Sequence, residues 1–500
     1  MKTRFSMFAF SCLALLLGSC HSEEGNEPTP EPQGGSQIRI NVATNSYTRA
    51  GEDAISSLYI AFYNGDNCLG VKKATGSGTS FTCDVPDNTK PTGLIAYANI
   101  EQSLVPQSAP SSITTTINGH GDETNLLMSS ARYFDSEKDM LVTPLTTENL
   151  VEGGTPVTIH LERVAAKVSF TYENGGKYNF TEGTAQIKAS IDSWGITAID
   201  AESYLVKQPA SFSSINSELS GWSTWNAPGS FISHWAHSVN HNLSSEKYSD
   251  GLSTADVKVI YATGNTLVDV DDTPSILTTE STRPLSVIAN SNAIPSVVIK
   301  GWYDILNQEA GADLYRTKKG IMTEDQLINS ITVFNRPNGA DNAYIKENIL
   351  DFAKPESNVA PSNYRFLKVK TGVISNLYKP DGTKWQESET NLFNSLLLEE
   401  FGYMEKYEKG QFCFIVPIKH LGPANSIAEY GIVRNHHYTV NLKNISGLGI
   451  GIADPKGEQN SPIVSYDDSN LPTVKYNVNA TVSVSDWSKV PTQNIDDLGK

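Results

Sequence analysis

The stretch "TPVTIHLERVAAKVSFTYENGGKYNF", residues 155–180, shows the fold class most clearly. Apolar and polar side chains alternate in it over the length of two strands, and "ENGGK" then supplies a turn. "AQIKASIDSWGITAID" (185–200) continues the pattern. Strands separated by turn signals about every ten residues are typical of a β-sandwich. We therefore expect a mainly β chain.

The same reasoning extends to the rest of the chain. Two helices are expected, at 323–335, with Thr323 as N-cap and acidic residues in the first turn, and at 389–407. The polar stretch 207–256 separates two β-rich halves, and we place the domain boundary near residue 220. Further strands are expected at 56–65 (ending in an Asn-Gly turn), 93–100, 257–263, 283–290, 295–306, 410–420 and 430–449.

Length and charge limit the possible functions. A chain of 500 residues suggests two or three domains. It has 38 Lys and Arg against 55 Asp and Glu, a net charge of −17. Nucleic acids and anionic membranes require a basic surface, so we expect no nucleic-acid partner. The charge fits an exported protein.

The N-terminus is typical of a targeting segment. Lys2 and Arg4 precede the apolar run "FSMFAFSCLALLLG", which is short for a membrane span. "LLGSC" follows and resembles a bacterial lipobox, which makes 1–19 a signal peptide and Cys20 the lipid attachment site. The alternative is an ordinary signal peptide with an incidental cysteine. The segment 21–36 is acidic and rich in Pro and Gly, so we expect it to be a disordered tether.

A strand and an exposed arginine follow the tether. Ile38, Ile40 and Val42 alternate with polar or small residues in "SQIRINVATNSYTRAGED" (36–53), which predicts a half-buried strand. Seven residues later, Arg49 precedes Ala50 in a polar, Gly-containing loop of the kind that proteases cut.

The C-terminal segment "LPTVKYNVNATVSVSDWSKV" (471–490) alternates more regularly than any other. We expect a long strand with one apolar face. Its apolar positions are Val474, Tyr476, Val478, Ala480, Val482 and Val484.

Few residues suggest catalysis or metal binding. His234, His237 and His241 invite a zinc interpretation, but no glutamate lies among them, and a polar surface loop is the favoured reading. "DVDD" (269–272) and "SYDDSN" (465–470) lack the spacing of a calcium loop and read as solvated turns. No GxSxG motif or phosphate-binding Gly loop is present. We therefore expect no enzymatic activity, no cofactor and no metal.

Two other residue types leave alternatives open. Cys68 and Cys83 lie across an expected hairpin and allow a disulfide, but with Cys413 they also fit buried small side chains, which we favour slightly. The tryptophans of the polar stretch either stack on sugars or form a small core beneath a loop. They are Trp222, Trp225 and Trp235.

Taken together, the chain resembles the Bacteroidia fimbrillins, or type V pilins. The resemblance rests on the lipobox Cys20, the strand before Arg49, "LERVAAKVSF" (161–170), "YGIVRNHHYTVNLKNISGLG" (430–449) and "VSVSDWSKVPTQNIDDL" (482–498). Length and the polar middle look most like the major shaft subunit of the short (minor) fimbriae. Residues 281–303 depart from a segment that many relatives carry there.

The resemblance implies two transthyretin-like β-sandwich domains, at 50–220 and 221–472, with a few short helices. Residues 20–49 would be a lipidated propeptide with a pro-strand at Ile38, Ile40 and Val42, and 473–500 a C-terminal donor strand. An arginine-specific protease would cut between Arg49 and Ala50 and release the pro-strand. The donor strand of the next subunit would then fill the groove, a mode of strand addition.

The resemblance also implies an outer-membrane lipoprotein precursor and a mature form in cell-surface fimbriae that support adhesion, biofilm formation and virulence. Expected partners are other copies of the chain, anchor and tip subunits, the protease, and host or bacterial surface receptors. Two alternatives stay open. One is a fimbrial tip or accessory adhesin that binds through 207–256, and the other is a surface glycan-binding lipoprotein that uses the tryptophans.

Overall fold

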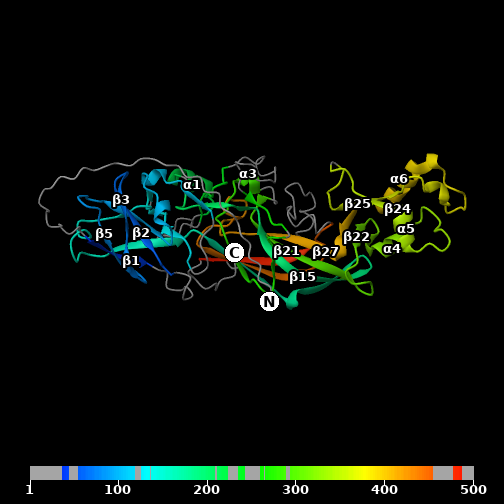
Figure 1. Ribbon diagram of the computed structural model, residues 1–500, viewed down its shortest axis with the longest axis horizontal. Helices are drawn as coiled ribbons and strands as arrows, with labels where there is room; N and C mark the ends of the chain where they lie inside the picture. Colours follow the sequence, from blue (N-terminus) through cyan, green and yellow to red (C-terminus); the bar gives the residue numbers. More distant parts are fainter. Residues whose placement is uncertain are drawn as a thin grey trace, which may run out of the picture. The chain divides into compact units, whose positions relative to one another are not determined.

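A computed structural model of the chain describes residues 37–43, 54–118, 125–135, 137–208, 211–222, 235–242, 259–263, 265–288, 293–357, 359–453 and 477–486. Every described residue belongs to one compact unit, Ser36–Lys500. This unit is mainly β with a few short helices, as expected (Figure 1). Among the described residues, no helix is long and apolar enough to cross a membrane.

The first sheet runs in the order β3-β2-β6-β8-β12-β1-β5-β4, with β11 paired to β6. One face of its strands forms a single core that contains Ile40, Ile60, Phe81, Leu94 and Ile159, so the sheet folds over on itself. Its strands are β1 (Gln37–Ala43), β2 (Leu58–Asn64), β3 (Asn67–Lys73), β4 (Thr75–Ser77), β5 (Ser80–Asp84), β6 (Gly93–Ala98), β8 (Met128–Ser130), β11 (Thr143–Pro144) and β12 (Val157–Arg163).

A second pair of sheets forms a sandwich, with orders β20-β13-β28-β30 and β14-β15-β21-β27-β29 and with β19 paired to β15. The two sheets share one core, in which Phe170 stacks on Trp194 and Tyr303 on Phe412. The strands are β13 (Ala166–Tyr172), β14 (Lys177–Glu182), β15 (Ala185–Thr197), β19 (Val268–Asp269), β20 (Ser275–Thr278), β21 (Ser296–Ile305), β27 (Gln411–Pro417), β28 (His436–Ile445), β29 (Ile450–Gly451) and β30 (Val478–Asp486).

A third cluster, with its own apolar core, lies between β21 and β27 in the sequence. A sheet in the order β23-β22-β26-β25-β24 packs with the helices there, and Figure 1 shows both together. Its elements are β22 (Leu314–Thr317), β23 (Gly320–Thr323), α4 (Glu324–Asn329), α5 (Asn342–Asn348), β24 (Leu350–Ala353), β25 (Tyr364–Val369), α6 (Thr390–Phe401) and β26 (Met404–Tyr407).

The remaining elements are short. Three two-stranded pairs are β7 (Thr116–Asn118) with β17 (Glu202–Tyr204), β9 (Phe134–Asp135) with β10 (Lys138–Asp139), and β16 (Ile199–Asp200) with β18 (Val259–Ile260). The helices are α1 (Phe212–Glu218) and α3 (Leu285–Ile288), and the 3-10 turns are Gln102–Leu104, Pro110–Ser112, Asn174–Gly176, Ile374–Asn376, Glu387–Glu389 and Glu408–Gly410.

The change from the first sheet to the sandwich falls at Val164 and Ala165, not near residue 220. Strands β13 and β15, which the sequence assigns to the first domain, pair with strands from the C-terminal half, and β14 pairs with β15. Both linking residues are fully buried. Residues 162–166 are all buried, so the alternation of exposed and buried positions stops at the crossing, but no Gly or Pro marks it in the sequence.

Local signals predicted several element ends and missed others. Thr323 caps α4 in a capping box, but the helix ends at Asn329 and not at 335. Helix α6 ends at Phe401 because Gly402 adopts a positive φ of 76°, and 404–407, expected to be helical, is a strand. Residues 283–290, expected as a strand, contain α3.

Candidate functional site

Strand β1 is inserted in the middle of the first sheet. It pairs antiparallel with β5, where Ile38 lies opposite Cys83, and parallel with β12, where Ile40 lies opposite Val157. Ile38, Ile40 and Val42 are 0 %, 1 % and 3 % exposed. The expected strand with alternate burial is therefore present. Its insertion between two partners distant in sequence is a feature that the pattern did not show. Below, the space that β1 fills between β5 and β12 is called the β1 slot.

The outer face of β1 is also held. The Arg39 guanidinium donates hydrogen bonds from Nη2 to the carbonyl oxygen of Gly153 at 2.9 Å and from Nε to that of Gly154 at 3.0 Å. Gln37 Nε2 donates to Asp84 Oδ1 of β5 at 3.1 Å. These contacts tie the strand to the loop before β12 and to β5. They involve exposed side chains, so each contributes little beside the buried face.

Cys83 lies on the core side of β5. Its side chain belongs to the same core as Ile38, and it is 1 % exposed. Burial, reinforced by the neighbouring Asp84 carboxylate, raises the pKa of its thiol to about 12. The thiol is therefore protonated and shielded near neutral pH. Cys68 and Cys83, for which the sequence allowed a disulfide, are separate thiols in the structure.

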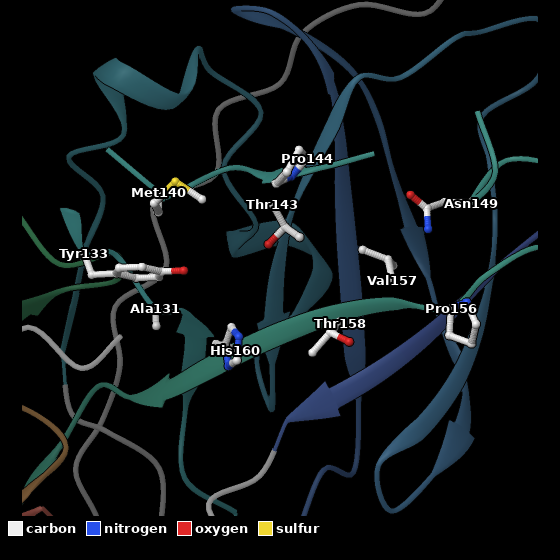
Figure 2. Close-up of a pocket in the computed structure, with 10 residues that line it drawn as sticks. All are labelled: Ala131, Tyr133, Met140, Thr143, Pro144, Asn149, Pro156, Val157, Thr158 and His160. Carbon is white, nitrogen blue, oxygen red and sulfur yellow. The ribbon is translucent and has the colours of Figure 1, made fainter. Parts of the chain in front are cut away.

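Beside β12 lies a cavity of about 300 Å³ (Figure 2). Figure 2 shows Thr158 and His160 of β12 facing it, opposite Thr143 and Pro144 of β11. Burial lowers the pKa of His160, which favours the neutral imidazole. The lining has no carboxylate, thiol or amine, and its ionisable side chains are His160 and Tyr133. The lining residues are Ala131, Tyr133, Met140, Thr143, Pro144, Asn149, Pro156, Val157, Thr158 and His160.

The C-terminal strand β30 lies at an edge of the sandwich. Among the described strands, β28 is its one partner, paired antiparallel with Val482 opposite Val440 and Val484 opposite Tyr438. Val478, Ala480, Val482 and Val484 are partly buried against the sandwich core. Val474 and Tyr476 lie outside the described residues, as do Cys20, Arg49 and Ala50.

Buried ion pairs hold two of the segments that carry the fimbrillin resemblance, 161–170 and 430–449. Glu280 Oε2 lies 3.0 Å from Arg434 Nη2, and both side chains are almost fully buried. Glu162 at the end of β12 lies 2.8 Å from Lys207, and burial raises the pKa of Glu162 although Lys207 opposes the rise. Glu162 and Arg434 lie in these motifs, Lys207 and Glu280 do not, and nothing in the sequence pattern predicts that they pair. A further pair, Asp200 with Arg283, has a separation of 2.8 Å.

Arg163 and Asn435 join the two most specific motifs directly. Arg163 Nη1 donates to Asn435 Oδ1 at 3.2 Å, and both residues are buried. Because Arg163 ends β12 and Asn435 precedes β28, this contact links one wall of the β1 slot to the strand that carries β30.

The other candidate residues have structural partners. Trp222 and Trp235 are buried in a small core, and Trp222 lies edge-on to His420, so neither offers an open face for sugar stacking. Tyr172 donates a hydrogen bond to Asp271, and the Asp271 amide donates to Asp269, which accounts for the "DVDD" turn. Trp225, His234 and residues 465–470 lie outside the described residues.

The geometry thus defines a class of protein: a mainly β chain with an N-terminal strand inserted in one sheet and a C-terminal strand at the edge of another. Residues 405–493 match the family described as major fimbrial subunit protein type IV, fimbrillin, C-terminal. This match contains β27, β28 and β30 and confirms the fimbrillin resemblance for the C-terminal part of the chain. The matched family is one of structural fimbrial subunits.

Solved structures give weaker likenesses. A Parabacteroides distasonis ATCC 8503 protein described as acting in cell adhesion is 14% identical, with 92% of this chain and 99% of that chain covered and a TM-score of 0.40. A fimbrilin from Porphyromonas gingivalis W83 is 15% identical, with the same coverages and a TM-score of 0.38. The tip fimbrial protein Mfa3 of Porphyromonas gingivalis is 12% identical, with coverages of 90% and 99% and a TM-score of 0.31. No curated protein sequence matches the chain.

Proposed function

We propose that this chain is the shaft subunit of a cell-surface fimbria and polymerises by exchange of β1 for the C-terminal strand of another copy. The observation that carries the proposal is the β1 slot. In it, β1 is hydrogen-bonded to β5 on one side and to β12 on the other, with Ile38, Ile40 and Val42 buried. The fimbrillin match over 405–493 supports a role as a fimbrial subunit.

Cleavage after Arg49 would detach residues 1–49, which include β1. The loss of β1 would unpair the facing edges of β5 and β12 and expose the apolar side chains beneath them, including Phe81, Cys83 and Ile159. Unpaired backbone groups and an apolar trough both favour the arrival of a new strand. The precursor is thus kept monomeric by its own strand and becomes competent for assembly when it is cut.

The C-terminal segment is a suitable replacement. In the part of the chain that the structure describes, β30 has one neighbouring strand, β28, whereas a strand in the slot has a neighbour on each side. Moving the tail from the edge into a vacant slot of another copy would add a second ladder of hydrogen bonds. Each apolar side chain that becomes fully buried contributes about 1.5–3 kcal/mol as an upper estimate. Such head-to-tail contacts do not close, so they build fibres.

The remaining parts of the proposal follow the resemblance. Residues 1–19 would direct export, lipid on Cys20 would hold the precursor in the outer membrane, and 473–500 would act as the donor. Anchor and tip subunits, an arginine-specific protease and surface receptors would be the partners. Adhesion, biofilm formation and virulence would be the outcome at the cell surface.

Variants of the cleavage position test the proposal. Arg49→Lys keeps the positive charge but removes the arginine, so the precursor should stay uncut and monomeric, whereas Thr48→Ala should be processed and assemble normally. Sequencing of the surface protein should give Ala50 as the N-terminal residue. Fibres formed by Arg49→Lys, or by a mature chain truncated after Pro472, would contradict the proposal.

A further inference from the structure

Three side chains of the types that bind metal ions in proteins lie close together at the end of α1. Glu218 is the last residue of the helix, and His237 and His241 lie four residues apart in the segment 235–242. One ligand atom from each lies within 4.8 Å of the others. The proposed strand exchange uses none of these side chains. The sequence hid this group because the glutamate lies far from the histidines in the chain, and the group is called the Glu–His–His cluster below.

One of the three ligand separations is close to that of a tetrahedral site, and the other two lie within 4.8 Å. Glu218 Oε2 and His237 Nε2 are 3.1 Å apart, close to the separation of about 3.3 Å between two ligands that each lie about 2.0–2.1 Å from a zinc ion. The rings of His237 and His241 stack at 4.1 Å with an interplanar angle of 10°. Binding therefore requires His237 to tilt out of the stack. The side chains of His237 and Glu218 are 14% and 35% exposed, which leaves room for this movement and for a water ligand.

Hydrogen bonds around Thr282 fix the tautomer of His241. The Thr282 hydroxyl donates to the Ala236 carbonyl oxygen at 2.9 Å and accepts from the Ser238 amide at 2.9 Å. Its only hydrogen is thus in use, so at 3.2 Å it must accept a bond from Nδ1 of His241. The lone pair of this imidazole then lies on Nε2. Metal-binding histidines are commonly oriented in this way, with the other ring nitrogen donating to a neighbour.

The charges around the cluster are compatible with a dication. The nearby Arg283 is paired with Asp200 Oδ1 at 2.8 Å, and Asp200 Oδ2 accepts from the Asn240 amide at 3.1 Å, so this cation is balanced. Glu218 supplies a further negative charge next to His237. The indole of Trp235 lies edge-on to both imidazoles, with ring centroids 5.2 and 5.0 Å away, and covers one side of the cluster.

We propose that Glu218, His237 and His241 form a binding site for Zn²⁺ or a similar divalent transition-metal ion, which fastens α1 to the segment 235–242. Two imidazoles and one carboxylate are a ligand set for zinc, whereas Ca²⁺ and Mg²⁺ prefer oxygen ligands alone. The fourth position is left to water. The two segments share a small apolar core through Ile215 and Trp235, and residues 219–234 of the chain separate them. A bound ion would add a second link between them on the polar side of this core.

Cobalt substitution tests the site. The purified protein, freed of metal with a chelator, is titrated with Co²⁺, whose visible absorption is strong in tetrahedral sites. We expect one ion per chain, displaced by Zn²⁺ and not by Ca²⁺. Glu218→Gln and His237→Ala should each weaken Co²⁺ binding at least about tenfold. The control is Glu347→Gln, near the end of α5, which removes an exposed carboxylate at a comparable helix position and should bind as the wild type does.

Two results would overturn the proposal: no saturable tetrahedral spectrum in the wild type, or wild-type affinity in both cluster variants. Circular dichroism and unfolding in metal-free buffer establish that each variant is folded. If His237→Ala fails to fold, Glu218→Gln decides alone, because its side chain is partly exposed. Zn²⁺ should also raise the unfolding temperature of the wild type and of Glu347→Gln, but not that of Glu218→Gln.

Discussion

The replacement of Ile40 by alanine measures how firmly the slot holds β1. Ile40 lies in the middle of the strand, is 1 % exposed, and packs in the first core. Truncation of such a side chain costs about 2–5 kcal/mol, because it removes apolar contacts and leaves a cavity. If the whole cost destabilises β1 in its slot, the fraction of molecules in which β1 has detached rises about 30-fold to a few thousand-fold, since each 1.4 kcal/mol is a factor of ten.

Hydrogen exchange read by mass spectrometry is the assay. Amides in 37–43, and in their partners 80–84 and 157–160, should exchange faster in Ile40→Ala by that factor. Amides of the third cluster, such as those of α6, should keep their rates. The matched control is Asn41→Ala in the same strand, because this side chain is exposed and its loss should cost no more than about 0.5 kcal/mol. Equal acceleration in the two variants would refute the reasoning that buried alternation holds the strand.

Three other predictions concern the body of the protein. Glu280→Gln should lower the free energy of unfolding by about 3–5 kcal/mol in a denaturant titration, because it leaves the buried Arg434 without its ionic partner, and wild-type stability would contradict the pairing. A Cβ at Gly301 would lie 2.1 Å from the Ser190 carbonyl oxygen, so Gly301→Ala should destabilise strongly, whereas Gly221→Ala, with its nearest atom at 3.6 Å, should not. Burial, reinforced by His237 and Arg283, lowers the pKa of His241 from 6.5 to about 3. Between these pH values the unfolded chain binds a proton that the folded chain does not, so the free energy of unfolding in metal-free buffer should fall as the pH drops from about 6.5 toward 3. In His241→Gln, the free energy of unfolding should depend less on pH over this range.

Short-range chemistry predicted much of the secondary structure. Alternation at Ile38, Ile40 and Val42 predicted β1, and Asn64-Gly65 predicted the turn after β2, where Gly65 adopts a positive φ of 57°. The strand predicted at 283–290 was wrong, because the short, mostly apolar run Leu285–Ile288 after Pro284 fits a short helix as well as a strand.

Long-range pairing was beyond the sequence. The parallel contact of β1 with β12 joins segments that no local pattern connects, and so does the contact of β13 with β28. The buried partners Glu280 and Arg434 are likewise far apart in the chain. Glu218 joined the histidines only once α1 was placed, which explains why the sequence favoured a surface loop over a metal site.

The thiol of Cys83 tests the central claim most directly, because it lies opposite Ile38 and is covered in the precursor. Alkylation at neutral pH, located by mass spectrometry, should leave Cys83 unmodified in the intact precursor. It should modify Cys83 after cleavage at Arg49 in a chain truncated after Pro472, and spare it again in fibres of the untruncated mature protein. Buried Cys413 serves as the internal reference and should stay unmodified throughout. A Cys83 that remains protected after cleavage and removal of the tail would contradict the account, because β1 would not have left its slot.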